Sequence, residues 1–345
     1  MEYAEKTAGA RLAPPGPGGT LLQIENLCVE FHTLEGVHQA VRDVSYTVQE
    51  GESLGVVGES GSGKSVTALS IMRLVPNPPG KTTGGRILFG GRDLLALPQE
   101  EINHIRGNEI SMIFQEPMTS LNPIHTCGKQ IMEPLLLHKG VSKAEAHEKA
   151  LEMMRLVGIP IPEQRMKEYP HQLSGGMRQR VMIAMSLVCE PRLLIADEPT
   201  TALDVTIQAQ ILELMKRLRG ELNSSIIMIT HDLGVIAEMC DRVVVMYAGQ
   251  VVEISGIHDL FSHPCHPYSE GLLRSIPTIS KEKKKLFSIE GTVPSPFAMP
   301  PGCSFAPRCR YAKDICHREC PALQDLGGGR AVRCWFWQET GKEEA

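Results

Sequence analysis

The feature that most constrains the fold of this chain is the stretch GESGSGKS at residues 58–65. The run before it, SLGVV, is apolar and typical of a buried strand, and KSVTALSIMRLV, which begins within it, has the spacing of a helix. A strand, a loop of this spacing and a helix together form a phosphate-binding loop. Its glycines let backbone N–H groups turn toward phosphate oxygens, and the helix adds its positive N-terminal end. The sequence therefore predicts an α/β fold with a nucleoside triphosphate site.

The loop and a second strand end supply the residue types that triphosphate chemistry needs. We expect Lys64 to reach the β- and γ-phosphates and Ser65 to offer its hydroxyl to Mg²⁺. Asp197 closes the apolar strand in RLLIADEP, where its carboxylate would hold Mg²⁺, and Glu198 is placed to accept a proton from an attacking water. The other loop positions expected to contact the nucleotide are Gly58, Ser60, Gly61, Gly63 and Val66.

Strand and helix patterns alternate along most of the chain. Alternating apolar residues at 21–31, with a slip near residue 25 that suggests a bulge, and at 44–48 predict an antiparallel layer. The apolar runs RLLIA and SIIMI alternate with helical segments, of which residues 142–157 open with a capping box, so we predict a parallel sheet. DRVVVMYAGQVVEISG predicts a hairpin that turns at Gly249.

Composition narrows the classes of protein to which the chain can belong. The net charge of −5 argues against a dedicated nucleic-acid-binding protein. No run of about 18 apolar residues occurs, so we expect no membrane span. The first 20 residues are rich in Pro, Gly and Ala and lack the apolar segment of a signal peptide. We expect this N-terminal tail to be disordered and the chain to be cytosolic.

The stretch LSGGMRQR at residues 173–180 points to a family. It resembles the signature motif of ATP-binding cassette (ABC) proteins, and Ser174, Gly175 and Gly176 precede a helix whose N-terminal end suits a γ-phosphate. The stretches MIFQEP, TTALD and ITHD match the remaining cassette motifs, in the family's order. The resemblance implies a head-to-tail dimer in which each signature acts on ATP bound to the opposite subunit.

The same resemblance implies roles for four further residues. Gln115 would be the lid glutamine that touches Mg²⁺ and the attacking water, and His231 would contact the γ-phosphate and orient that water. Asp204 would lie in the loop that crosses the dimer interface, and Phe31 would stack on adenine. Taken alone, each of these residues is more often a loop, cap or strand residue, so the roles rest on the set as a whole.

A longer resemblance covers nearly all of residues 21–337. The runs around the lid glutamine and the signature, and HPCHPYSEGLLRSIP farther on, resemble the ATPase subunits of bacterial oligopeptide and dipeptide importers, including relatives that import nickel or glutathione. The implied partners are two membrane permeases, a homologous second ATPase and, indirectly, an extracellular solute-binding protein. The chain would then sit peripherally at the cytoplasmic face of the inner membrane, with no nucleic-acid partner.

The resemblance also implies a division of the chain. After the tail at 1–20, an ABC nucleotide-binding domain would span residues 21–260, with a parallel core, an antiparallel β subdomain and a helical subdomain at about 116–172. A small Cys-rich extension with a metal site would occupy residues 261–345. The motif that opens the extension, His266, Pro267 and Tyr268, is expected to act locally as a capped helix start.

Two other classes of function fit the sequence less well than an importer ATPase. A soluble cassette ATPase that works on ribosomes or DNA usually carries two cassettes or a long coiled-coil insertion, and the sequence has neither. A redox or metal sensor with a vestigial ATPase conflicts with intact Lys64, Asp197, Glu198 and His231.

Half of the ten cysteines lie after residue 300. In a cytosolic protein, clustered cysteines favour metal or redox chemistry over disulfides, and the spacings here are looser than those of short zinc knuckles. In the importer family, tail cysteines in a similar pattern hold a 4Fe-4S cluster, and the four matching positions are Cys303, Cys309, Cys316 and Cys334. Cys320 is a fifth thiol that could replace Cys334 or stay free, and zinc or no metal remain alternatives to the cluster.

Overall fold

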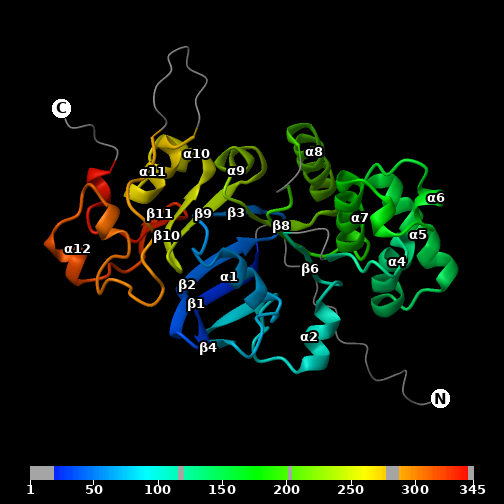
Figure 1. The fold of residues 1–345 in the computed structure, drawn as a ribbon, viewed down its shortest axis with the longest axis horizontal. Coiled ribbons are helices and arrows are strands. Elements are labelled where there is room, and N and C mark those ends of the chain that lie inside the picture. Colours follow the sequence, from blue (N-terminus) through cyan, green and yellow to red (C-terminus); the bar gives the residue numbers. More distant parts are fainter. Residues whose placement is uncertain (1–18, 116–119, 201–203, 277–286, 341–345) are drawn as a thin grey trace, which may run out of the picture.

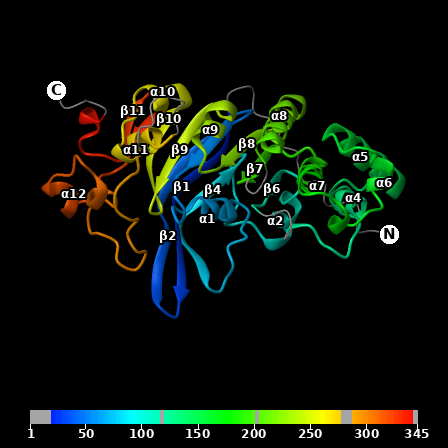
Figure 2. The same cartoon turned by 45° about the horizontal axis from the view of Figure 1, so that its top comes forward.

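A computed structural model describes residues 19–115, 120–200, 204–276 and 287–340. The expected N-terminal tail lies outside these ranges except for Gly19 and Thr20, and Thr20 already begins a strand. Figures 1 and 2 show an elongated molecule with sheets at its centre, a group of helices at one end and the C-terminal segment at the other.

The centre of the molecule is an eight-stranded sheet in the order β11-β12-β10-β9-β3-β8-β7-β6. The parallel strands are β6 (Ile110–Ile113), β7 (Leu193–Asp197), β8 (Ser225–Ile229), β3 (Ser53–Val57) and β9 (Arg242–Tyr247). The antiparallel strands are β10 (Gln250–Gly256), β12 (Arg330–Val332) and β11 (Gln324–Gly327). Every residue of β3, β6, β7 and β8 is buried, which explains why their sequences are continuous apolar runs.

A second, antiparallel sheet has the order β2-β1-β4-β5. Its strands are β1 (Thr20–Thr33), β2 (Gly36–Gln49), β4 (Gly80–Phe89) and β5 (Arg92–Asp93). The predicted bulge is confirmed, because the register of β1 against β2 shifts between Ile24 and Leu27, and Asn26 has a φ of 48°. The predicted hairpin turn at Gly249 joins β9 to β10.

Helices pack against both faces of the main sheet and extend beyond it at one end. They are α1 (Lys64–Ile71), α2 (Gln99–Ile105), α4 (Cys127–His138), α5 (Lys143–Leu156), α6 (Pro162–Arg165), η1 (Pro170–Gln172), α7 (Gly175–Leu187), α8 (Val205–Leu222) and α9 (Leu233–Met239). Helices α4 to α7 form the group at one end of the molecule (Figure 1). The expected helix at 142–157 is α5, and its capping box between Ser142 and Glu145 is present. No helix within the described ranges is long and apolar enough to cross a membrane.

Alternate residues of the central strands point into two separate cores. Leu193 and Ile195 of β7 belong to the core that also holds the buried side chains of the antiparallel sheet and α1. Leu194 and Ala196 belong to the core that holds α7, α8, α9 and the helical group. This period of two is the pattern of a sheet buried on both faces.

The C-terminal segment is built into the main sheet, which the sequence did not predict. Its helices are α10 (Ile257–Ser262), α11 (Pro267–Arg274), η2 (Ala306–Arg308), α12 (Asp314–Arg318) and η3 (Trp337–Glu339). The segment also contains two strands. β12 pairs with β10 at Glu253↔Val332 and Ile254↔Ala331, and β11 pairs with β12, so the tail adds both strands to the main sheet. The expected helix start at His266 is confirmed, because its side chain accepts a hydrogen bond from the Tyr268 N–H.

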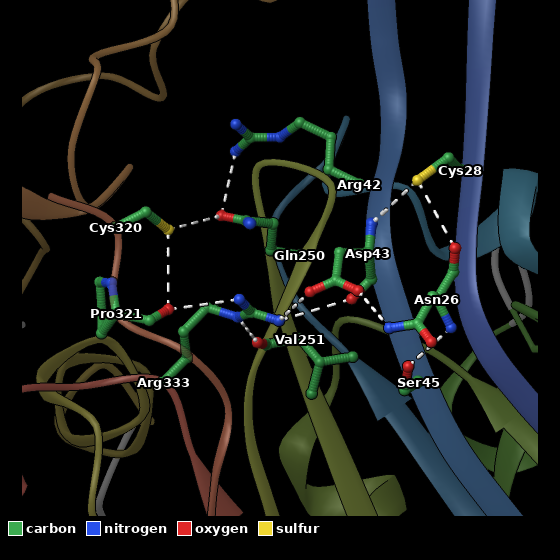
Figure 3. A network of polar contacts seen from close by, with 10 residues as sticks. All are labelled: Asn26, Cys28, Arg42, Asp43, Ser45, Gln250, Val251, Cys320, Pro321 and Arg333. Atoms are coloured by element: carbon green, nitrogen blue, oxygen red, sulfur yellow. Dashed lines mark hydrogen bonds and ion pairs between the residues drawn. The ribbon is translucent and has the colours of Figure 1, made fainter. Parts of the chain in front are cut away.

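Arg333, directly after β12, ties the tail to two other strands (Figure 3). Its Nε donates to the Val251 carbonyl of β10 at 2.9 Å, and Nη1 donates to the Pro321 carbonyl of the tail at 3.3 Å. Nη2 lies 3.2 Å from a carboxylate oxygen of Asp43 in β2. Its side chain is only 7% exposed, so these partners replace most of its contact with water.

Candidate nucleotide site and cysteine cavity

The phosphate loop runs from the end of β3 to the start of α1, as the sequence predicts. Two of its glycines are required by close packing. A Cβ atom on Gly58 would lie 2.1 Å from the Met246 carbonyl oxygen, and one on Gly63 would lie 2.6 Å from the Ala40 carbonyl oxygen. Both also have positive φ values, 153° and 94°, which a side chain disfavours. Ser60 and Gly61 lie at the exposed tip of the loop.

Lys64 lies beneath this loop, and 7% of its surface is exposed. Its Nζ donates to the carbonyls of Gly58 (2.7 Å) and Glu59 (3.0 Å) and to the Ser62 hydroxyl (3.3 Å). Burial lowers the pKa of the Lys64 ammonium, while the negative charges of Glu198, Asp197 and Glu59 act in the opposite direction. A cation is therefore held where the loop turns around it.

Ser65 and Asp197 meet beside the loop. The Ser65 hydroxyl donates to a carboxylate oxygen of Asp197 at 3.1 Å, although the two residues are 132 positions apart. Desolvation raises the pKa of Asp197, which is 5% exposed; the Ser65 hydrogen bond opposes the rise and the charge of Glu198 adds to it. A hydroxyl and a carboxylate are oxygen ligands of the kind that Mg²⁺ takes.

The Glu198 carboxylate, after β7, contacts two residues that follow the neighbouring strands β6 and β8. Gln115, after β6, donates from Nε2 to one carboxylate oxygen of Glu198 at 3.1 Å. Nδ1 of His231, after β8, lies 3.3 Å from the other oxygen. Because β6, β7 and β8 are parallel neighbours, their carboxyl ends share one edge of the sheet. Of the residues around Gln115, positions 116–119 lie outside the described ranges.

A cavity of about 310 Å³ adjoins the phosphate loop. Phe31 lines it together with His38, whose ring stacks on that of Phe31 with centroids 5.6 Å apart. Gly61, Gly63 and Val66 line it from the loop side. The sequence predicted Phe31 at the nucleotide site but not His38. It also did not predict Pro296 and Met299, the tail residues that form part of the cavity wall. No local pattern links Pro296 and Met299 to a loop more than 200 positions away.

The signature residues lie elsewhere on the molecule. Ser174 caps α7 by accepting a hydrogen bond from the Met177 N–H, and Gly175 and Gly176 form the first turn of that helix. Both views place the start of α7 apart from α1 and the phosphate loop. Asp204 caps α8 through the Ile207 N–H at 3.0 Å, which is the plain structural role considered for it.

Four tail cysteines surround one small cavity. Cys303, Cys309, Cys316 and Cys334 all line it, with aromatic and proline side chains between them. Cys320 does not line it: it is exposed, and its sulfur faces the Gln250 side-chain oxygen and the Pro321 carbonyl (Figure 3). The four cysteines therefore share the lining of one cavity, whereas Cys320 lies outside that lining but near Cys303, whose pKa burial raises and the charge of Cys320 would raise further.

Backbone N–H groups of residues that follow three of the four cysteines act on their thiols. Against a larger effect of burial in each case, Phe305 and Ala306 lower the pKa of Cys303, Tyr311 lowers that of Cys309, and Phe336 lowers that of Cys334. Burial raises the pKa of Cys309 to about 11 and that of Cys334 to about 12, and the backbone donors partly oppose these shifts. Within the described ranges, no group of three or more His, Cys, Asp or Glu side chains could hold a metal ion.

Comparison with known proteins finds two family models in the chain. The model of the ABC transporter family matches residues 41–201. A model described as the oligopeptide/dipeptide transporter C-terminal region matches residues 252–316.

Several relatives match nearly the whole chain. The oligopeptide transport ATP-binding protein AppD of Bacillus subtilis is 55% identical over 94% of this chain and 99% of its own length. The oligopeptide transport ATP-binding protein OppD of Salmonella typhimurium is 51% identical over 93% of this chain and 95% of its own. The dipeptide transport ATP-binding protein DppD of B. subtilis is 53% identical over 92% and 94%.

Solved structures match the cassette part. The dimeric post-hydrolysis state of the ATP-binding cassette MJ0796 with ADP and Pi superposes with a TM-score of 0.62 at 29% identity, covering 68% of this chain and 98% of that one. CbiO1 of Clostridium perfringens, part of an ABC transporter complex, gives a TM-score of 0.60 at 26% identity, covering 71% and 91%.

Proposed function

Because the chain belongs to the ATP-binding subunits of the ABC transporter family, we propose that it hydrolyses ATP to drive the import of oligopeptides or dipeptides. The observation that carries the chemistry is the Glu198 carboxylate, held between Gln115 and His231 beside Lys64 and Asp197. The peptide substrate is inferred from the relatives, whose names specify oligopeptide or dipeptide transport, and from the C-terminal region shared with such transporters.

The residues divide the reaction between positioning and proton transfer. Lys64 and the loop N–H groups bind the phosphates, and Ser65 and Asp197 would hold Mg²⁺, which would offset phosphate charge. Glu198 accepts the proton of the attacking water. Gln115 and His231 fix the two carboxylate oxygens of Glu198 and orient that water. Phe31 stacks on the adenine ring.

A second ATPase subunit completes the site. The first turn of α7, with Ser174, Gly175 and Gly176, presents a helix N-terminus that suits the γ-phosphate held by a partner cassette. The separation of this turn from the chain's own phosphate loop supports action across a dimer. Asp204, at the start of α8, is assigned to the same interface.

Dimer closure is the step that does work on the membrane subunits. We assign their contact to the helical subdomain at about 116–172, and we assign the chain to the cytoplasmic side of the cell membrane as a peripheral subunit with two permeases. A solute-binding protein outside the cell would deliver the peptide.

The substitution Glu198→Gln tests the assignment of the base. It keeps the shape and the hydrogen-bonding reach of the side chain but cannot take up a proton. We expect MgATP binding to remain and turnover in the assembled transporter to fall about 100-fold or more. Turnover near the wild-type rate would show that Glu198 is not the base.

We further propose that Cys303, Cys309, Cys316 and Cys334 hold a 4Fe-4S cluster. Their position around one cavity supports this, because a cluster bonds each thiolate to a different iron and its ligands therefore surround it; in the described structure the thiols are not grouped closely enough to form a metal site, so the cluster would have to draw them together. Against the larger effect of burial, the backbone N–H groups that lower the pKa of three of these thiols favour thiolates. When bound, the cluster would act as a structural staple for a segment with few apolar residues.

Iron and zinc analysis of anaerobically prepared protein tests this site. We expect iron and a brown colour in the wild type and in Cys320→Ser, and loss of both in Cys309→Ser. Zinc without iron would show that the four cysteines form a zinc site, and a preparation with neither metal would show that they hold no metal. Loss of iron in Cys320→Ser would show that the four ligands are assigned wrongly.

A further inference from the structure

The phosphate loop is held by the tail at one residue, Glu59. The Tyr268 hydroxyl accepts a hydrogen bond from the Glu59 backbone N–H at 2.8 Å. The Arg308 guanidinium meets the Glu59 carboxylate as a fork, with Nη1–Oε2 at 2.9 Å and Nη2–Oε1 at 3.2 Å. Main chain and side chain of one loop residue are thus both fixed from the C-terminal segment.

Arg308 is itself firmly placed. Its side chain is 5% exposed, and its other hydrogen bonds go to the carbonyls of Glu290 (3.0 Å) and Ile289 (3.3 Å) and to the Tyr247 hydroxyl (3.2 Å). A guanidinium held by so many partners cannot follow a moving carboxylate. It therefore sets the position of Glu59.

The same segment forms the wall of the cysteine cavity. Arg308 directly precedes Cys309, and Phe305 lines the cavity. The Phe305 ring also packs against Tyr247 and Tyr268, with centroids 5.2 and 5.4 Å apart. A continuous set of contacts therefore leads from the cysteines to the two groups that hold Glu59.

We propose that this tail segment is a positioning element of the nucleotide site, and that the order of the cysteine cavity sets the affinity for ATP through Arg308 and Tyr268. The inference rests on the proposed function. A loop released from the tail keeps the Lys64 contacts to the Gly58 and Glu59 carbonyls but loses those to the Glu59 N–H and carboxylate, so nucleotide binding must order these groups at a cost in affinity. Neither Arg308 nor Tyr268 touches Glu198, so the proton-transfer step is unaffected.

The substitution Arg308→Gln tests this inference. We expect the Kd for MgATP of the full-length chain and the KM for ATP of the assembled transporter to rise about tenfold, the range for loss of a hydrogen bond between charged groups. The kcat should stay unchanged, because binding is lost equally from substrate and transition state. Glu59→Gln should raise KM similarly, and the double variant should add little to either single change.

Arg310→Gln is the matched control. Arg310 lies two positions further along the same tail and pairs with Glu270, but it is half exposed and has no contact with the phosphate loop among its described partners. We expect KM and kcat of this variant to equal those of the wild type. Arg308→Lys should recover part of the affinity, because it keeps a positive charge near Glu59.

The outcomes separate this inference from the proposed function. A wild-type chain that does not bind MgATP would overturn both. Normal ATP binding by the wild type together with an unchanged KM in folded Arg308→Gln and Glu59→Gln would overturn the inference alone. A fall in kcat at unchanged KM would also overturn it. Cys309→Ser, which alters the cavity wall directly beside Arg308, should raise KM as well, and an unchanged KM would break the link to the cysteine cavity.

Discussion

Arg333 is the residue whose replacement should loosen the tail most selectively. Arg333→Met keeps the apolar stem of the side chain but removes the donors to the carbonyls of Val251 and Pro321 and to Asp43. Loss of a donor to a buried carbonyl costs about 1–3 kcal/mol, and Val251 is fully buried. Asp43 is half exposed, so the ion pair adds less than about 1 kcal/mol. We expect the tail to lose about 3 kcal/mol of stability in total.

Both tryptophans of the chain, Trp335 and Trp337, lie in this tail. Tryptophan fluorescence therefore follows the tail, whereas circular dichroism follows the whole fold. A loss of this size should move the fluorescence transition of Arg333→Met to lower urea by about 1–2 M. Arg86→Met, which removes an exposed ion pair with Glu25, is the control and should cost less than about 1 kcal/mol. Superimposable fluorescence curves for Arg333→Met and wild type would refute the reasoning.

Three further predictions concern single groups. Asp197→Asn should raise the melting temperature of the nucleotide-free chain at pH 7 and abolish Mg²⁺-dependent ATP binding. Desolvation raises the folded-state pKa of Asp197, so ionisation of this carboxyl group destabilises the fold above about pH 4. The gain in melting temperature of Asp197→Asn over the wild type should therefore fade as the pH drops below that value. Equal melting temperatures of the two proteins at pH 7 would contradict this. A thiol reagent at pH 8 should label the exposed Cys320 well before Cys240, because burial raises the pKa of Cys240 to about 12. Mass spectrometry of digests measures the order of labelling, and the reverse order would contradict the burial of Cys240. Gly63→Ala should cost more stability in a urea titration than Gly61→Ala, because the added methyl group meets a carbonyl oxygen at 2.6 Å only at position 63; equal costs would contradict the close packing there.

The local parts of the nucleotide site could be read from the sequence. The loop from Gly58 to Ser65 carries its own strand and helix signals, and Asp197 ends an apolar strand that had to lie beside it. The positions of Gln115 and His231 followed only from the family's motif order. The structure adds that both reach Glu198, because three parallel strands end at one edge.

Contacts between residues far apart in the chain could not be predicted from the sequence. The helix after the phosphate loop was expected to continue to Val75 but ends at Ile71, because Arg73 takes a left-handed conformation and Arg106 donates to its carbonyl. Strands β11 and β12 have only four and three residues, too few for an alternating pattern. The pairing of Arg308 with Glu59 spans 249 positions and leaves no local trace.

ATP turnover by the purified transporter in lipid vesicles tests the central claim most directly. The complex, isolated through this chain together with its permeases and second ATPase, would be assayed with its solute-binding protein, with and without peptide. Peptide should stimulate hydrolysis and be accumulated at the expense of ATP, and Glu198→Gln should abolish both effects. A rate of ATP hydrolysis that peptides leave unchanged but that nickel or glutathione increases would contradict peptide import. A chain that never copurifies with membrane subunits would contradict a role in transport.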